Sequence, residues 1–484
     1  MAGETNKGKN ESKRVDLRLE IKDFGPISKG KITIKPLTIF IGPNNSGKSY
    51  AAMIVNSIFE ANATKTIMPL MGEKKTIPPL FWEISDILKD FSQLKKEILH
   101  IEDGGEIEIP GQFLDKLNKE VFLEIYGNRL KREILRSYGC NLKELIRNGK
   151  SSFEISIDIG SYNINLKSKG NEIIIKDIYK NSNHKFKVIV SSGIKENNKN
   201  VSEYIILRSD THKIFTLAPV IQNYESIIRF CFYLPAARSG ILLEHKALAG
   251  EIIKQSPFVD IGILQDIPKL SGVVSDLIST LLTLSTDKKG HFYGLAQDFE
   301  KELIKGNISS PRPDKHTTPE IKYSFNGVKI PLNRASSTVS ELAPLILYLK
   351  YLIQPDNVLI IEEPEAHLHP RNQLILAKYL VRMIRRGLRI LITTHSDYLL
   401  EQLNNFIMLS SIEPSKYGYN KEDFLLPDEV SAYVFEPDKE ENGYKINEID
   451  VNDEDGISQE EFTRVYEELY DETFSMRRKV SKDK

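Results

Sequence analysis

Residues Gly42–Ser49 read GPNNSGKS, and this stretch decides the fold. It matches the pattern G-x-x-x-x-G-K-[ST] without a gap. The apolar run TIFI that precedes it is typical of a buried strand, and the segment SYAAMIVNSIFEA that follows has the apolar spacing of a helix. A strand, a glycine-rich loop and a helix in this order predict a loop that holds phosphate groups.

The residues of this loop have separate expected roles. Gly42 and Gly47 let backbone N–H groups converge on phosphate oxygens at the N-terminus of the helix, where the helix dipole favours negative charge. Lys48 is expected to reach the β- and γ-phosphates, and Ser49 to place its hydroxyl on Mg²⁺. The residues expected to bind the nucleotide are Gly42, Pro43, Asn44, Asn45, Ser46, Gly47, Lys48, Ser49 and Tyr50.

A second stretch, NVLIIEEPEAHLHP at residues 357–370, carries two adjacent acids after an apolar run. Val358–Ile361 is typical of a buried strand, and we expect Glu362 and Glu363 at its C-terminal end, beside the glycine-rich loop. Glu362 fits the acid that contacts Mg²⁺ directly or through water, and Glu363 fits the base that polarises an attacking water. The alternative is a charged strand end in solvent. It is disfavoured because two adjacent acids at the end of an apolar strand are costly without a cation beside them.

With GPNNSGKS, IIEEPEAHLHP and ITTHSDYLL, the chain resembles the OLD-like and RecF-like ABC-class ATPases, which are relatives of SMC and DNA-repair ATPase heads. The resemblance covers residues 17–59 and 319–410. It implies an α/β fold, an ABC-type P-loop NTPase head with an inserted α+β arm or lid region. It also implies ATP and Mg²⁺ as ligands and hydrolysis of ATP to ADP and phosphate.

The resemblance assigns a role to His395 of ITTHS, which it makes the switch histidine that contacts the γ-phosphate. An imidazole is a hydrogen-bond donor suited to charge in the transition state, although a single histidine is more often structural. The expected catalytic residues are therefore Lys48, Glu363 and His395. Glu362 departs from the family pattern, where aspartate is commoner, but its longer side chain still suits the metal.

The segment ASSTVSELAPLILYL occupies the signature position of the family. Ser336 aligns with the serine that meets the γ-phosphate in the partner head, so its contact is expected in trans. Ser337 and Thr338 stand where transporters and SMC proteins have glycines, and Ser337 or Ser340 are alternatives to Ser336. Residues 365–369 resemble the D-loop, which in the family approaches the opposite head.

Basic residues outside these motifs suggest further roles. Arg238, in FYLPAARSG, ends a predicted core strand near the position of the family's Q-loop, and a structural salt bridge is the alternative. Two basic clusters favour solvated faces, with the second preferred as a DNA or partner surface. The first consists of Lys378, Arg382, Arg385, Arg386 and Arg389, and the second of Arg129, Lys131, Arg132, Arg136, Lys143 and Arg147.

Composition bounds the remaining classes. The net charge of −1 over 484 residues supplies no overall field for nucleic acid. Two cysteines are too few for a disulfide framework, and no apolar run is long enough to span a membrane, which together predict a cytoplasmic protein that does not bind a membrane. The expected regions are a disordered tail (1–16), an N-terminal lobe of the ATPase core (17–59), an inserted α+β region (60–230), a helical lid (231–318), a C-terminal lobe (319–410) and a small α/β tail (411–484).

Three uses of such an ATPase compete. We favour the ATPase subunit of a prokaryotic anti-phage system such as Septu or PARIS, which forms a head-to-head dimer or higher homo-oligomer and acts with a separate nuclease or effector. Residues 411–484 are too short for the Toprim domain of OLD nucleases. The alternatives are a RecF-like DNA-repair ATPase that binds DNA directly, and a scaffold that binds ATP and turns it over slowly.

Overall fold

The computed structural model is a mixed α/β structure, which confirms the predicted fold class. The predicted disordered tail, residues 1–16, and parts of the predicted inserted region lie outside the described residues. The described residues are 17–61, 106–109, 126–159, 162–170, 172–180, 186–191, 206–208, 214–216, 230–242, 270–311, 320–458, 470–474 and 476.

The chain divides into two compact units, each of which is built from separate stretches of sequence. Unit 1 consists of residues 1–34, 50–231 and 438–444, and unit 2 of residues 35–49, 232–437 and 445–484. The segment KITIKPLTIFIG at residues 31–42 contains the end of β2 (Ile27–Ile34) and all of β3 (Leu37–Ile41). Pro36 separates them because proline has no N–H to donate to a sheet.

The sheet of unit 2 contains the strands that precede the predicted functional motifs. Its strand order is β11, β15, β16, β3, β17, β18. The bounds are β11 Cys231–Leu234, β15 Val358–Glu362, β16 Arg389–Thr394, β3 Leu37–Ile41, β17 Val430–Pro437 and β18 Tyr444–Ile449. The pairs β15–β16, β16–β3 and β3–β17 are parallel. Every residue of β3, β15 and β16 is buried, as expected of parallel strands covered on both faces.

Parallel pairing fixes which residues share an edge of this sheet. Glu362 is opposite Thr393, and Thr394 is opposite Ile41. The carboxyl ends of β15, β16 and β3 therefore meet at one edge. The glycine-rich loop leaves the sheet there, and α1 (Lys48–Glu60) begins at the end of that loop.

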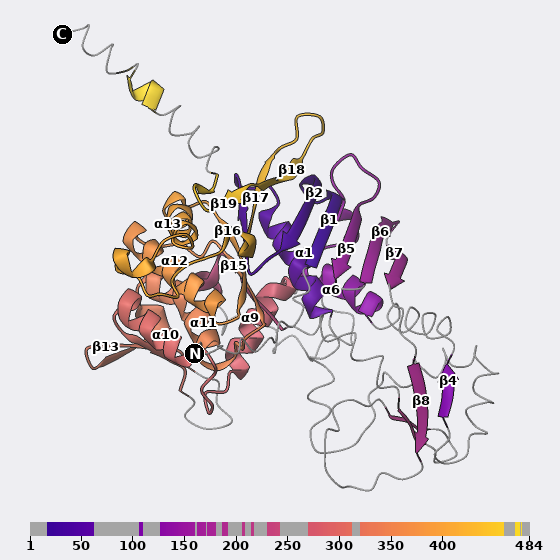
Figure 1. The fold of residues 1–484 in the computed structure, drawn as a ribbon, viewed down its shortest axis with the longest axis horizontal. Helices are drawn as coiled ribbons and strands as arrows, with labels where there is room; N and C mark the ends of the chain where they lie inside the picture. Colours follow the sequence, from indigo (N-terminus) through magenta and orange to yellow (C-terminus); the bar gives the residue numbers. More distant parts are fainter. Residues whose placement is uncertain are drawn as a thin grey trace, which may run out of the picture. The chain divides into compact units, whose positions relative to one another are not determined.

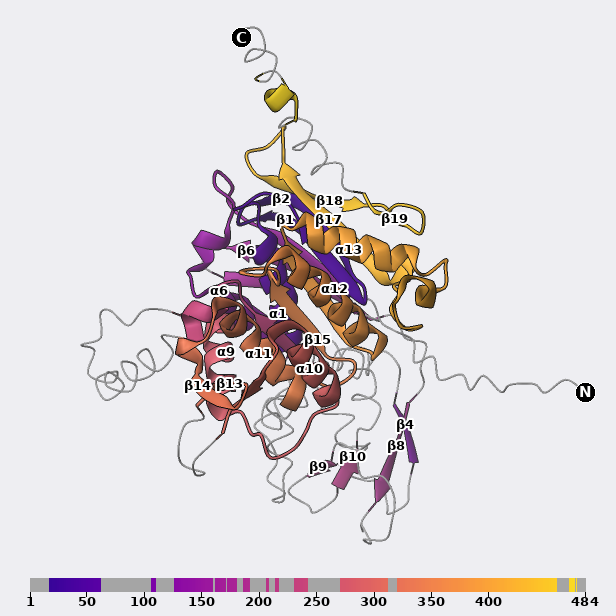
Figure 2. The ribbon, with the colours of Figure 1, turned by 90° about the vertical axis from the view of Figure 1, so that its left-hand side faces the viewer.

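Helices and short hairpins complete unit 2. A single hydrophobic core joins the sheet to these helices, and α12 and α13 lie side by side in both views (Figure 1, Figure 2). The helices are α9 Gly272–Thr283, α10 Tyr293–Phe299, α11 Ser337–Tyr351, α12 Pro370–Arg385 and α13 Asp397–Met408, with short helical turns η7 Glu300–Ile304, η8 Leu332–Arg334, η9 Pro414–Tyr417 and η10 Pro427–Glu429. The hairpin strands are β12 Asn307–Ser309, β13 Lys322–Phe325, β14 Val328–Pro331, β19 Val451–Asn452 and β20 Gly456–Ile457. None of the helices described here is long and apolar enough to cross a membrane.

Unit 1 is mostly antiparallel, in agreement with the alternating apolar pattern of its strands. One set of strands has the order β2, β1, β5, β6, β7, and another has the order β4, β8, β10, β9. The first set is β2 Ile27–Ile34, β1 Leu17–Phe24, β5 Glu154–Ile159, β6 Tyr162–Lys169 and β7 Glu172–Lys180; the second is β4 Glu106–Ile109, β8 Phe186–Ser191, β10 Ile214–Thr216 and β9 Ile206–Arg208. The helical elements among its described residues are α6 Asn128–Tyr138, η4 Leu142–Leu145 and the part of α1 from residue 50 onward. Edge-on aromatic contacts of Phe24 with Tyr50, Tyr138 and Phe153 form part of its core.

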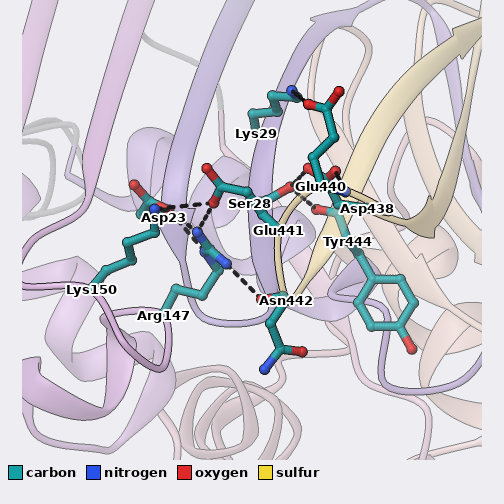
Figure 3. Close-up of polar contacts among 10 residues, drawn as sticks. All are labelled: Asp23, Ser28, Lys29, Arg147, Lys150, Asp438, Glu440, Glu441, Asn442 and Tyr444. Atoms are coloured by element: carbon teal, nitrogen blue, oxygen red, sulfur yellow. Dashed lines mark hydrogen bonds and ion pairs between the residues drawn. The ribbon is translucent and has the colours of Figure 1, made fainter.

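A buried arginine ties together distant segments of unit 1 (Figure 3). The Arg147 side chain is 4% exposed, and its Nε and Nη2 donate to Asp23 Oδ1 at 2.8 and 2.6 Å. Its Nη1 donates to the carbonyl oxygen of Asn442 at 2.6 Å, and Nη2 also pairs with Glu441. Arg147 therefore fastens the segment 438–444 to the end of β1, instead of facing solvent as a member of the second basic cluster.

The contrast between Arg147 and its neighbour Lys150 gives a test of this network. Lys150 pairs with Glu441 at 3.2 Å but is 38% exposed. Arg147→Met should lower the free energy of unfolding by about 3 kcal/mol, because it strands the buried carboxylate of Asp23. Lys150→Met should cost less than about 1 kcal/mol, since solvent screens its pair. Denaturant unfolding of both variants measures this, and equal losses would contradict the assigned role of Arg147.

Candidate functional site

The glycine-rich loop follows β3 with a backbone that only certain residues can adopt. Gly42 has φ 140° and Gly47 has φ 103°. A Cβ on Gly42 would lie 2.5 Å from the carbonyl oxygen of Phe435, so no larger residue fits there. Asn45 also has a positive φ of 61°, a conformation that asparagine tolerates better than most residues. These positions give the loop the curvature that a phosphate cradle requires.

Lys48 and Ser46 mark this loop as a polar site. The Lys48 ammonium is buried and donates to the carbonyl oxygens of Gly42 and Pro43 at 2.9 and 2.7 Å. The Ser46 hydroxyl is buried and has no hydrogen-bond partner in the described part of the chain. A buried cation on carbonyl oxygens and an unsatisfied hydroxyl at a helix N-terminus suit an anionic ligand. Ser49 lies in the first turn of α1, partly exposed.

Glu362, the last residue of β15, is 6% exposed and held at both carboxylate oxygens. Tyr233 donates its hydroxyl to Oε1 at 2.6 Å, and the Ala236 N–H donates to Oε2 at 3.1 Å. Among the described contacts each carboxylate oxygen accepts one of these hydrogen bonds, and a carboxylate offers about four acceptor sites. The donor set of a carboxylate and the Ser49 hydroxyl is one that Mg²⁺ prefers.

Glu363 differs from its neighbour in both backbone and exposure. Its φ is +43°, in the left-handed region, which costs a residue other than glycine on the order of 1–3 kcal/mol. The Glu363 N–H donates to the carbonyl oxygen of Thr393 at 2.9 Å and lies 3.2 Å from the Thr393 hydroxyl, which holds this conformation. The side chain is 41% exposed, and Oε1 lies 3.8 Å from Nε2 of His395. The turn thus separates a buried, fixed Glu362 from a solvent-accessible Glu363.

His395 follows β16 at the same edge, with a side chain 34% exposed. Burial is the largest influence on its pKa and lowers it; the charge of Lys48 lowers the pKa further, and Glu363 opposes both. The structure therefore brings Lys48, Glu363 and His395 into electrostatic contact. A neutral imidazole at this place retains one N–H that can donate a hydrogen bond.

Glu365 fixes the turn that carries His395. Its Oε1 accepts hydrogen bonds from the Thr394 hydroxyl at 2.7 Å and from the His395 N–H at 2.8 Å. Its Oε2 is shielded from solvent and lacks a hydrogen-bond partner among the residues that the structure describes. Burial raises the pKa of Glu365, while its two hydrogen bonds lower it. The sequence analysis assigns Glu365 to the segment that resembles the D-loop and does not predict this contact. Its local signal is an acid three positions after Glu362.

The predicted signature segment lies at the start of α11. Ser336 is exposed and caps the helix, because its hydroxyl accepts a hydrogen bond from the Val339 N–H at 3.4 Å. Ser337 is exposed as well, whereas Ser340 is buried and donates to the carbonyl oxygen of Leu332 at 3.4 Å. Of the three candidate serines, Ser336 and Ser337 are thus accessible to another molecule.

The two histidines after Glu365 have separate local roles. His367 has φ 59°, and its carbonyl oxygen accepts a hydrogen bond from the Thr338 hydroxyl at 3.0 Å. His369 caps α12, where its Nδ1 accepts a hydrogen bond from the Arg371 N–H at 3.3 Å. Within the described ranges, no group of three or more His, Cys, Asp or Glu side chains is placed to hold a metal ion.

Two other predicted residues, Tyr50 and Arg238, are held by contacts of their own. The ring of Tyr50 packs on Phe24 and Tyr138 in unit 1, with ring centroids 6.0 and 5.1 Å apart. Its predicted contact with a nucleotide stays a prediction. Arg238 is 2% exposed, and its guanidinium contacts the backbone of Glu362 and Glu363.

The first basic cluster is largely neutralised by acids of unit 2. Arg382 pairs with the buried Asp423 through two hydrogen bonds of 2.7 and 2.8 Å. Lys378 pairs with Glu302, and Arg385 with Glu429. Pairing with acids far along the chain makes this cluster a structural one.

The second basic cluster keeps only part of its predicted surface. Arg132 and Lys143 are exposed, while Arg136 pairs with Glu133 at 2.6 Å. Arg147 does not belong to the predicted DNA or partner surface, since its guanidinium contacts Asp23, Glu441 and Asn442.

Comparison with known proteins shows the family to which the chain belongs. A family model described as an AAA ATPase domain matches residues 17–400. A comparison with curated proteins gave no match.

Among solved structures, the chain is similar to the Smc head domain with an extended coiled coil bound to the C-terminal domain of ScpA, from Pyrococcus furiosus. The sequence identity is 10% and the TM-score 0.40, with 94% of this chain and 99% of that chain covered. It is also similar to the SMC head domain from Thermotoga maritima, at 10% identity and a TM-score of 0.33, with 90% of this chain and 100% of that chain covered.

The pKa of His395 leads to a prediction about stability. Because the pKa is lowered in the folded state, the unfolded chain binds a proton first as the pH falls. The free energy of unfolding of the wild type should therefore decrease, relative to that of His395→Gln, as the pH falls below about 6.5. Lys48→Ala should weaken this dependence without removing it, since burial remains. Denaturant unfolding between pH 5 and 8 measures the difference, and a difference independent of pH would contradict the environment assigned to His395.

Proposed function

The chain belongs to the AAA ATPase domain family, and from this premise we propose that it binds ATP at Gly42–Ser49 and hydrolyses it to ADP and phosphate. One observation carries the proposal. The glycine-rich loop, Glu363 and His395 follow three neighbouring parallel strands and meet at one edge of the unit 2 sheet. Phosphate binding, water activation and charge stabilisation are thus available within one site.

The triphosphate would lie over the loop, with backbone N–H groups and the dipole of α1 facing its oxygens. Lys48, which donates to Gly42 and Pro43, would turn its ammonium to the β- and γ-phosphates. Ser49 and Glu362 would hold Mg²⁺, and the bound ion would neutralise phosphate charge. Tyr233 and the Ala236 N–H keep the Glu362 carboxylate in place before any ligand binds.

Glu363 would act as the base. Its exposed carboxylate would take a proton from a water as the water oxygen bonds to the γ-phosphorus and the bond from that phosphorus to the ADP oxygen breaks. The proton would then pass to solvent or to the released phosphate. His395, neutral because its pKa is lowered, would donate its N–H to a γ-phosphate oxygen as charge develops there.

A second copy of the chain is the proposed partner at this site. The support is the exposed start of α11, where Ser336 or Ser337 would contact the γ-phosphate of the opposite head. Binding of ATP would then join two heads, and hydrolysis would separate them. We propose, on the resemblance to Septu and PARIS ATPases, that this cycle controls a separate nuclease or effector. DNA is the less favoured partner because Arg147 is withdrawn from the basic surface.

Removal of the base tests the proposal. Glu363→Gln should lower kcat about 100-fold to 1,000-fold and leave ATP bound, because the amide cannot accept the proton. Lys48→Ala should weaken ATP binding about 10-fold to 100-fold, through loss of charge-assisted hydrogen bonds. Steady-state hydrolysis and equilibrium binding of ATP measure these changes, and light scattering with ATP shows whether Glu363→Gln accumulates as a dimer.

Controls for these variants come from the exposed residues Lys421 and Glu422 of the same unit. Lys421→Ala and Glu422→Gln should retain wild-type turnover and binding. Turnover in Glu363→Gln equal to that of the wild type would contradict the role of the base. A single turnover that yields stable ATP-bound oligomers of the wild type would instead favour the slow scaffold.

A further inference from the structure

Arg238 is a buried cation that donates to the backbone carbonyl oxygens of Glu362 and Glu363. Its side chain is 2% exposed, and the residue begins the helical segment 238–242 that follows β11. Nη1 donates to the carbonyl oxygen of Glu362 at 2.6 Å and to that of Pro235 at 3.0 Å. Nη2 donates to the carbonyl oxygen of Glu363 at 3.1 Å. The guanidinium thus holds the backbone of both acids proposed to act on Mg²⁺ and on water.

The hydrogen bond from Arg238 matters most for Glu363, whose backbone is in the left-handed region with φ +43°. Such a conformation persists only when the surroundings hold it. The Glu363 N–H is bonded to Thr393 on one side of the residue, and its carbonyl oxygen is bonded to Arg238 on the other. Both ends of the residue are fixed, so the direction of its carboxylate depends in part on Arg238.

The other partner of Arg238 is Glu341 of α11. Nε of Arg238 lies 3.1 Å from Glu341 Oε2 and donates to the Glu341 carbonyl oxygen at 3.3 Å. The Glu341 side chain is also 2% exposed, and its Oε1 accepts hydrogen bonds from the Ser239 hydroxyl at 2.6 Å and the Ser239 N–H at 3.2 Å. Glu341 lies four residues after Ser337, one helical turn from the exposed start of α11.

We infer that Arg238 and Glu341 form a positioning pair that couples α11 to the Glu363 backbone, so that a shift of α11 changes the rate of water activation in the same chain. The inference rests on the proposed function, because it concerns the orientation of the proposed base. It adds a regulatory connection: a molecule that contacts Ser336–Thr338 acts on hydrolysis through one ion pair. Neither member of the pair touches the reacting atoms.

A second buried ion pair on the same helix provides a matched control. Lys350 and Glu300 are each 1% exposed, and Nζ lies 2.7 Å from Oε1. Lys350 also donates to the carbonyl oxygen of Ile308 at 2.7 Å. This pair contacts η7 and β12, and it has no hydrogen bond to Glu362 or Glu363 among the described contacts. Its loss therefore reports the structural cost of breaking a buried pair on α11.

The test compares Arg238→Lys, Glu341→Gln and the double variant with Lys350→Met and Glu300→Gln. Lysine keeps the charge but cannot reach several carbonyl oxygens in the fixed geometry of a guanidinium. Three quantities are measured for each: the melting temperature without nucleotide, the Kd for ATP, and kcat at a temperature at which all variants are folded.

Arg238→Lys and Glu341→Gln should each lower kcat at least tenfold while the Kd for ATP changes less than threefold. The double variant should lose little more than either single variant, because both act through one contact. The control variants should show a similar decrease in melting temperature but keep kcat within threefold of the wild type.

Losses of kcat that match those of the control variants would overturn the inference, and so would a rise in Kd with kcat unchanged. Additive losses in the double variant would also overturn it. A wild type that does not hydrolyse ATP would overturn the proposed function together with the inference, and is distinguished by the absence of turnover before any substitution.

Discussion

The parallel pairing of β15, β16 and β3 is the constraint on which the site depends. Parallel strands place their carboxyl ends at one edge, and in unit 2 that edge receives the glycine-rich loop, the turn with Glu362 and Glu363, and the turn with His395. The strands are buried on both faces, so their positions are fixed by the hydrophobic core and not by the polar residues at their ends. The core thus aligns chemical groups that lie more than 300 residues apart in sequence.

Hydrogen bonds then fix the turns that carry Glu362, Glu363 and His395 at the edge of the sheet. Glu365 holds the His395 turn through the N–H of His395, and Thr393 and Arg238 hold Glu363 at its two ends. Glu362 is fixed at both oxygens. The Glu363 side chain, by contrast, is accessible to water. A rigid backbone with one accessible carboxylate is the arrangement that general base catalysis requires.

Local pattern explains which parts could be predicted from the sequence. GPNNSGKS with its flanking strand and helix, and the acids that close an apolar strand, depend on neighbours in sequence, and the α/β class followed from them. Pairing over long separations could not be predicted. Arg147 belonged to a run of basic residues, yet its partners Glu441 and Asn442 lie almost 300 positions away. Arg238 and Glu341 are likewise joined only by the fold.

We propose that the edge formed by these strands binds the triphosphate of ATP. A structure of the Glu363→Gln variant with bound ATP and Mg²⁺ tests it most directly. We expect the β- and γ-phosphates over Gly42–Ser49, with the Lys48 ammonium moved from the Gly42 and Pro43 carbonyl oxygens to phosphate oxygens and Mg²⁺ between Ser49 and Glu362. A nucleotide bound elsewhere, with Lys48 still on those two carbonyl oxygens, would contradict this proposal.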